Sequence, residues 1–242
     1  MSHTPNIRSV TLIHTRHGPE LPHYRRLDFT KWNKLEYLEF TSSSLVGFPH
    51  FPETLKHLDI SGTRMMPRIP MFSEEERIAL ENLQGLETFI CEGGHHINLE
   101  AIYTVIEASR KAGNLKTLRI GDGLDSEELP RHLPDYSIPS LRTLGLSRWL
   151  ASEEQLLTFL RHCPAIEYLN VSFTKITGVA IKELMTRESG PLKWLRLNDC
   201  TKLSPDAVDY ARSLGAVVEY SITHDWSNGK GSWRDRRLTS GL

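Results

Sequence analysis

An apolar phrase recurs along this chain, with large apolar residues at its first, fourth and sixth positions and mostly polar residues between them. Alternation of this kind predicts a short strand whose apolar anchors all face one side. The seven clearest copies are Leu35-Leu38-Phe40, Leu55-Leu58-Ile60, Leu86-Phe89-Cys91, Leu115-Leu118-Ile120, Leu141-Leu144-Leu146, Ile166-Leu169-Val171 and Leu192-Leu195-Leu197. Weaker copies stand near the two ends, at Ile7-Val10-Leu12 and Val217-Tyr220-Ile222. The pattern therefore predicts about nine short strands, one from each copy.

The distance between copies leaves room for one returning segment in each unit. The step is 20 residues from Leu35 to Leu55 and 31 residues from Leu55 to Leu86, and the other steps fall between these. The shortest step cannot hold a full helix, so an extended or 3₁₀ return is expected there. Helix signals mark four later returns: the capping box of Ser152 and Gln155, the Asn98 cap before Leu99, the Ser204-Pro205 start, and the apolar stripe after Gly178.

A period in the twenties with this apolar spacing resembles the leucine-rich repeat. Small residues stand three places after the third anchor and predict a tight corner; they are Ser43, Thr63, Gly94, Gly123, Thr174 and Cys200. One unit cannot bury its own apolar face, so stacking of neighbours stabilises such a fold. We expect an α/β solenoid over residues 1–224, with a curved parallel sheet on the concave side and helices and irregular loops on the convex side. Residues 225–242 depart from the pattern and are expected to form a flexible or capping tail.

Composition narrows the range of functions. A formal net charge of −1 gives no general attraction to nucleic acid or to membranes. The three cysteines, Cys91, Cys163 and Cys200, form an odd and scattered set at packing positions, which favours a reducing compartment in the cytoplasm or nucleus over a disulfide scaffold. The sequence shows neither an apolar run near 18 residues nor a secretory leader. We therefore expect an intracellular protein without a cofactor.

Two short motifs suggest chemistry. Arg16-His17-Gly18 resembles the Arg-His-Gly motif of histidine phosphatases, in which the histidine becomes phosphorylated, but the mechanism needs a second histidine and further arginines. His95 and His96 near Cys91 suggest a metal, yet the remaining ligands of a closed zinc shell do not stand at useful spacing. In repeat register these residues fall at corners and anchors. We expect no catalytic and no metal site.

The last two repeats resemble the cysteine-containing class of leucine-rich repeat. In one of them Cys200 takes the corner and Leu203-Ser204 opens the helix, and the preceding copy has Thr174 at the corner. Together with the run at 212–215, these phrases are similar to the repeat regions of fungal F-box proteins. The resemblance implies the substrate-recognition arm of a Skp1–cullin–F-box (SCF) ubiquitin ligase. Residues 1–34 do not read as the helical F-box, so an adaptor is expected only if that module is missing from this chain; a stand-alone scaffold or inhibitor is the alternative.

The strand residues between the anchors define the concave surface. Side chains two and four places after each first anchor point away from the core. The early repeats present Glu39 and Asp59, whereas the later repeats combine arginine with aromatic residues, a composition typical of binding hot spots. The predicted protein-binding residues are Arg119, Arg148, Tyr168, Phe173, Trp194 and Arg196. The expected partner is an acidic or phosphorylated segment; alternatively, Tyr168 and Trp194 stack on each other and only cover the sheet.

Overall fold

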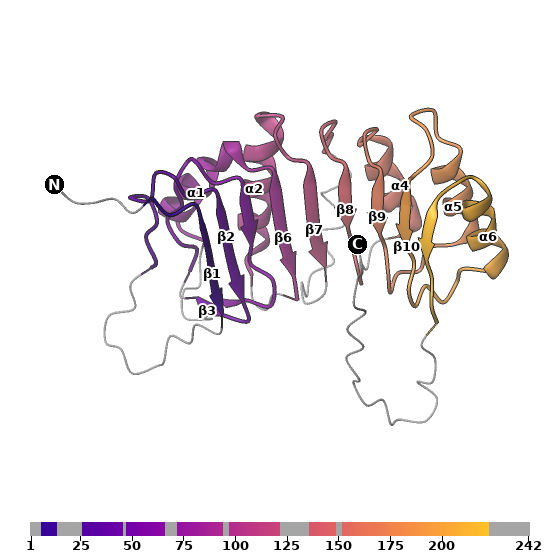
Figure 1. The fold of residues 1–242 in the computed structure, drawn as a ribbon, viewed down its shortest axis with the longest axis horizontal. Helices are drawn as coiled ribbons and strands as arrows, with labels where there is room; N and C mark the ends of the chain where they lie inside the picture. Colours follow the sequence, from indigo (N-terminus) through magenta and orange to yellow (C-terminus); the bar gives the residue numbers. More distant parts are fainter. Residues whose placement is uncertain are drawn as a thin grey trace, which may run out of the picture.

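The computed structural model describes residues 6–13, 26–45, 47–65, 72–93, 97–121, 136–148 and 152–222. Within these residues, nine strands form one parallel sheet in the order of the chain (Figure 1). The strands are β1 (Ser9–Ile13), β2 (Tyr37–Thr41), β4 (His57–Asp59), β6 (Thr88–Glu92), β7 (Thr117–Gly121), β8 (Thr143–Gly145), β9 (Tyr168–Asn170), β10 (Trp194–Arg196) and β11 (Val217–Glu219). Each strand pairs with the next unit, as expected for a stacked repeat.

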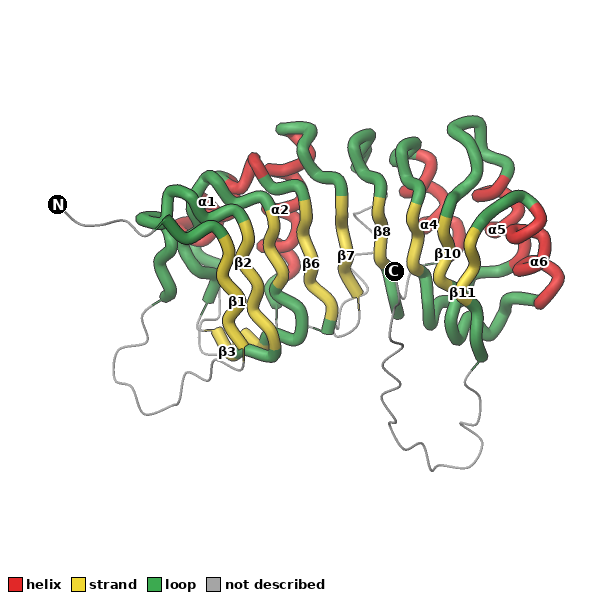
Figure 2. Tube along the Cα trace, in the orientation of Figure 1, coloured by secondary structure: helices red, strands yellow, loops and turns green. Residues whose placement is uncertain are grey.

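The described helices cover one face of this sheet, and none of them lies on the other face, called the open face here (Figure 2). They are α1 (Glu74–Glu81), the 3₁₀ turn η1 (Leu83–Gly85), α2 (Leu99–Lys111), α4 (Glu153–Arg161), α5 (Gly178–Met185) and α6 (Pro205–Ser213). The predicted capping box forms, because the Ser152 hydroxyl accepts from Gln155 N and the Gln155 side chain accepts from Ser152 N. Among the described helices, none has both the length and the apolar character that a membrane crossing requires.

The anchors form a continuous core between the two layers. The fourth-position anchors of the seven clearest copies are completely buried, and they include Leu58, Leu118, Leu144, Leu169 and Leu195. Their neighbours in register are the same anchors of the next repeat, such as Leu144 beside Leu169. The predicted leucine-rich-repeat solenoid is therefore confirmed, and the predicted concave side corresponds to the open face.

The small corner residues have a different role from the one predicted. The four that the structure describes, Ser43, Thr63, Thr174 and Cys200, are buried. Three of them donate a hydrogen bond to the third-anchor carbonyl of the preceding repeat: Ser43 to Leu12 O (3.3 Å), Thr63 to Phe40 O (3.4 Å) and Cys200 to Val171 O (3.2 Å). The backbone turns one residue earlier, at left-handed residues. These are Ser42, Gly62, Gly93, Arg148, Phe173 and Asp199. The corner residue is small because it is buried against its neighbour.

The predicted register of the last copy was wrong. Val218 lies beside Leu195, and Glu219 lies beside Arg196, two places away from the alignment that the phrase Val217-Tyr220-Ile222 implied. Val217 is therefore 62% exposed on the open face, while Val218 faces the core. Position 215, which takes the place of the first anchor, is a glycine with a φ of 90° at the end of α6, and its lack of a side chain concealed the true register.

The first half contains elements that the apolar pattern did not predict. The return after β2 holds a two-residue strand β3 (Ser44–Leu45), parallel to β5 (Arg64–Met65), and no helix, as the short step required. The longer return before Leu86 contains α1 and η1. Ser73 and Glu76 form the capping box of α1. The Glu76 side chain is buried, accepts a hydrogen bond from Phe48 N and forms an ion pair with Arg26. These contacts fix the first repeats to one another.

Candidate functional site

The open face has a hollow of about 420 Å³ over β7 to β10. Four of the six predicted binding residues line it: Arg119, Tyr168, Trp194 and Arg196. The rest of the lining comes from Thr143, Leu144, Gly145 and Asn170. The parallel register explains the gathering, because Tyr168 lies beside Trp194 and Asn170 beside Arg196 on adjacent strands. Residues from four repeats therefore meet at one place.

Gly145 is part of the lining of the hollow, and it is the surface position without a side chain between Arg119 and Asn170. A β-carbon at this position would lie 3.0 Å from Arg119 Cγ and 3.3 Å from Glu92 Oε1. The flanking strands keep their side chains, so the face sinks at β8. The missing side chain also leaves room above β8 for the side chains of Arg119 and of its partner Glu92.

Both arginines of the hollow are held by carboxylates of the same chain. Arg119 donates to Glu92 through both Nε (3.3 Å) and Nη2 (2.6 Å), and Arg196 Nε lies 2.9 Å from Glu219 Oε2. These contacts orient the guanidinium groups and offset their charge. The hollow is therefore polar and nearly neutral. The predicted register did not reveal this, because it placed Glu219 opposite Trp194 and not opposite Arg196.

The aromatic residues remain available at the surface. Tyr168 is 42% exposed, and Trp194 is half-buried beside it. Their rings make no stacked contact with each other, in contrast to Tyr37 and His57, whose rings stack at 4.1 Å on the same face. The alternative in which Tyr168 and Trp194 only cover the sheet stays a prediction, since the partial exposure of both side chains fits either role.

Arg148 and Phe173 lie apart from this hollow. They occupy equivalent turns just beyond the strands, with φ values of 54° and 61°, and the Arg148 guanidinium lies 4.9 Å from the centre of the Phe173 ring. Phe173 is 47% exposed. The structure thus divides the predicted set into a hollow of four residues and a separate cation–π pair at the strand ends.

The motifs that suggested chemistry gain no support. His17, Gly94, His95, His96 and Gly123 lie outside the described residues, as does the segment 225–242. Cys91 is a completely buried anchor, and burial raises the pKa of its thiol well above the ordinary value. In the described part of the chain, no three His, Cys, Asp or Glu side chains gather in a way that could hold a metal ion.

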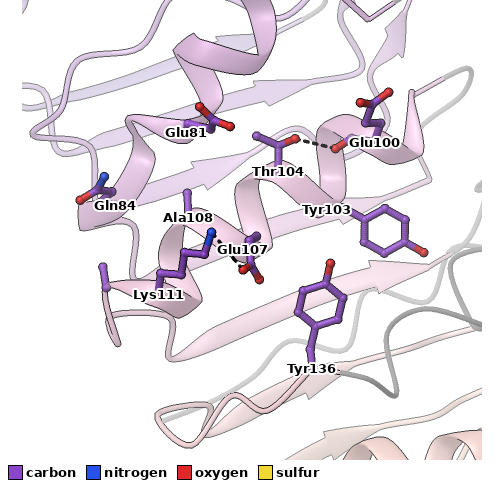
Figure 3. A pocket seen from close by; sticks show the side chains of 10 residues that line it. Glu81, Gln84, Glu100, Tyr103, Thr104, Glu107, Ala108, Lys111 and Tyr136 are labelled. Carbon is purple, nitrogen blue, oxygen red and sulfur yellow. Dashed lines mark hydrogen bonds and ion pairs between the residues drawn. The ribbon is translucent and has the colours of Figure 1, made fainter.

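A second hollow, of about 550 Å³, lies on the helical side between α1, α2 and Tyr136 (Figure 3). Tyr103 and Tyr136 stack with parallel rings whose centres are 6.2 Å apart, and Arg110 lies over the Tyr136 ring. Glu107 binds both Arg110 (2.8 Å) and Lys111 (3.3 Å). Because these groups are satisfied by one another, the hollow is explained as packing between repeats.

A row of charges along the edge of the sheet was not predicted. In every copy but the last, the residue after the first anchor is charged. Several of these side chains pair between repeats: Arg8 with Glu36 (3.9 Å), Glu36 with Lys56 (3.2 Å), Glu87 with Lys116 (2.6 Å), Arg142 with Glu167 (3.5 Å) and Glu167 with Lys193 (2.9 Å). The signal was present at one fixed position of the phrase. The predicted surface consists of the positions two and four places after each first anchor and does not include this one.

Comparisons with known proteins give little beyond the architecture. No family model and no curated protein matches the sequence. Sixteen solved chains match the structure, among them one described as the crystal structure of the TLR13–ssRNA13 complex, with 14% identity and a TM-score of 0.29. That match covers 72% of this chain and 34% of the other, so this chain spans about a third of its length. The fold assignment rests on the sheet and its register.

Proposed function

We propose that this chain is a non-enzymatic protein-binding module that uses the hollow on its open face. The observation that carries the proposal is the convergence of Arg119, Tyr168, Trp194 and Arg196 around one hollow whose lining includes Gly145. Tyrosine, tryptophan and arginine dominate binding hot spots because they bury a large area and keep a polar group for orientation. A hollow between them gives a partner side chain a place to be enclosed.

The two ion pairs support an acidic or phosphorylated segment as the partner. Glu92 and Glu219 hold the guanidinium groups in place before binding, which reduces the conformational entropy that a partner must overcome. Each guanidinium carries five N–H donors, so donors remain after one carboxylate is bound. Exposed ion pairs contribute only about 0–1 kcal/mol, so a partner carboxylate or phosphate can share or replace them at small cost.

The finer proposal is that the module is the substrate-recognition arm of an SCF-type ubiquitin ligase. It is supported by the cysteine-containing repeat class, in which Cys200 and Thr174 occupy equivalent buried corners. Cys91, Cys163 and Cys200 are all free and buried, which supports a reducing compartment. The competing proposal is a stand-alone scaffold or inhibitor. Co-purification of a Skp1-type adaptor with the natural full-length protein supports the ligase role, and partners captured without any adaptor support the scaffold.

The hollow can be tested by affinity capture with quantitative mass spectrometry. Trp194→Ala combined with Arg196→Glu should abolish capture of the partner proteins and leave the melting temperature nearly unchanged, since both side chains are partly exposed. A matched control is Lys175→Glu, which reverses the charge of an exposed residue outside the hollow. Phe173→Ala separates the turn pair from the hollow. Capture at wild-type levels by the double variant rejects the hollow as the binding site.

A further inference from the structure

Glu39 and Asp59 form an uncompensated acidic pair on the open face. The two residues lie directly opposite each other on β2 and β4, and both side chains are half-buried. Like charges at opposed positions of neighbouring strands destabilise a sheet. Their presence therefore needs an explanation other than stability.

Other carboxylates of this surface each have a cation. Glu92 pairs with Arg119 and Glu219 pairs with Arg196, while Glu36 on the edge lies between Arg8 and Lys56. Within the described residues, no lysine or arginine lies within ion-pair distance of Glu39 or Asp59. Among the described residues, the carboxylates of the open face that have no cation partner therefore lie together on β2 and β4.

Neighbouring groups hold these carboxylates in position without neutralising them. Tyr37 Oη and Thr41 Oγ1 each donate to Glu39 at 2.8 Å, and Ser61 N donates to Asp59 Oδ1 at 2.8 Å. The hydroxyls of Thr41 and Tyr37 lower the pKa of Glu39, so this carboxylate is ionised at neutral pH. The pair is thus charged and oriented in the free protein.

The nearest imidazole does not supply the missing positive charge. His57 is stacked on Tyr37 with an angle of 11° between the rings, and burial lowers the pKa of its imidazole, which is neutral at pH 7. Its Nε2 is buried and makes no hydrogen bond with the described residues. An unsatisfied buried nitrogen costs about 1–3 kcal/mol unless a partner completes it. This second observation is independent of the acidic pair and also indicates an incomplete site.

We propose that Glu39, Asp59 and the Tyr37–His57 pair form a docking position for a basic segment of a partner protein, which places an arginine or lysine between the two carboxylates. Adjacent strands are about 4.8 Å apart, a spacing that a guanidinium can bridge with two of its N–H edges. Charge complementarity decides the chemistry of the partner, and the aromatic pair offers ring surface to the alkyl stem or the cation. The site lies outside the hollow of the proposed function and stands without it.

The test is a titration by fluorescence anisotropy at low ionic strength. The probe is a fluorescein-labelled peptide in which three arginines alternate with serines, and a peptide with citrulline in place of arginine is its uncharged match. Glu39→Gln with Asp59→Asn should weaken binding of the arginine peptide at least about tenfold, equivalent to 1.4 kcal/mol. Because the new amide oxygens can still accept the hydrogen bonds from Tyr37, Thr41 and Ser61, the melting temperature should change little.

The matched control is Glu53→Gln with Glu154→Gln, which changes the net charge equally at two exposed positions elsewhere. The control should bind the arginine peptide within about twofold of wild type, as should Trp194→Ala, so that failure of the hollow and failure of this site are distinguishable. Equal weakening by both charge variants, no weakening by either, or equal affinity for the citrulline peptide overturns the proposal.

One further variant distinguishes a partner from the chain itself. The sequence carries arginines at 234, 236 and 237. Changing all three to glutamine in the full chain should leave the affinity for the arginine peptide unchanged. A severalfold gain in affinity that disappears with Glu39→Gln and Asp59→Asn assigns the position to this chain's own basic segment and overturns a separate partner.

Discussion

The carboxylate of Glu153 accepts two hydrogen bonds from Thr177, one from its backbone N–H and one from its hydroxyl at 3.0 Å. Glu153 is the first residue of α4, and Thr177 is the N-cap of α5. The Thr177 hydroxyl in turn accepts from Val179 N. One side chain thereby joins the start of one helix to the start of the next, across two repeats.

Glu153→Ala should lower the free energy of unfolding by about 1–3 kcal/mol, because hydrogen bonds to a charged group are lost and the Thr177 N–H is left without its acceptor. Urea denaturation followed by circular dichroism measures the change. Glu154→Ala is the control, since Glu154 is exposed in the same first turn, and it should cost less than about 0.5 kcal/mol. Equal effects of the two variants would show that only the charge near the helix start matters.

Leu169→Ala should cost about 2–5 kcal/mol of unfolding free energy, through lost burial and the cavity left behind. Leu169 is completely buried between Leu144 and Leu195. Val179→Ala, at a position that is 73% exposed, should change stability little. Thermal and chemical denaturation of the two variants measures the difference, and a loss below 1 kcal/mol for Leu169→Ala would contradict the stacked core.

Two glycines of the open face should respond very differently to alanine. A β-carbon at Gly121 would lie 2.2 Å from the backbone oxygen of Ser147, so Gly121→Ala should force neighbouring repeats apart and destabilise the fold severely. At Gly145 the closest atoms are Arg119 Cγ at 3.0 Å and Arg119 Cβ at 3.2 Å, which need to shift by only a few tenths of an ångström, so Gly145→Ala should cost far less stability than Gly121→Ala and should weaken partner binding. Similar melting temperatures for the two variants would contradict this difference.

The Glu39 carboxylate accepts a hydrogen bond from the Tyr37 hydroxyl and raises the pKa of Tyr37 to about 12. Because the folded pKa lies above the unfolded value near 10, this hydrogen bond contributes stability below pH 10, and the contribution is lost as pH rises from 10 to 12. Tyrosinate absorbance should show one late-titrating group that is absent in Tyr37→Phe. An unchanged titration in that variant would assign the late group elsewhere.

We expect His17 to support no phosphatase activity, although it lies outside the described residues. The Arg-His-Gly motif falls where a repeat corner is expected, without a matching second histidine. Phosphate-ester hydrolysis should be at background level for wild type and for His17→Ala alike. Hydrolysis that the substitution abolishes would reverse this prediction.

The sequence predicted the fold well because its strongest signal, the leucine at the fourth position of each phrase, is also the residue that the fold buries completely. The pattern failed where the informative position is not apolar. Gly215 replaces an anchor and hid the register of β11, and with it the pairing of Glu219 with Arg196. The capping box of Ser73 and Glu76 begins a helix that is mostly polar, so the apolar pattern did not predict it.

The candidate site shows the same limit. Alternation along each strand placed Tyr168 and Trp194 on the open face correctly. It could not show that Gly145 leaves a hollow between them and Arg119, since a missing side chain has no hydrophobic signal. Nor could it separate Phe173 from the hollow, because the left-handed turn depends on the backbone path between repeats.

The row of edge charges also favours the present order of the units. Removing the unit that begins at Leu55 would bring Glu36 of one repeat against Glu87 of the next, whereas in the intact chain Lys56 lies beside Glu36. Removing the unit that begins at Ile166 would likewise place Arg142 against Lys193. In the intact chain Glu167 lies between these two residues and pairs with both. Loss of either unit would therefore replace opposite charges with like charges at one junction, at a cost of about 0–1 kcal/mol per exposed pair. The intact chain has one such junction, between Lys116 and Arg142, so the edge row favours this order of units without requiring opposite charges at every step.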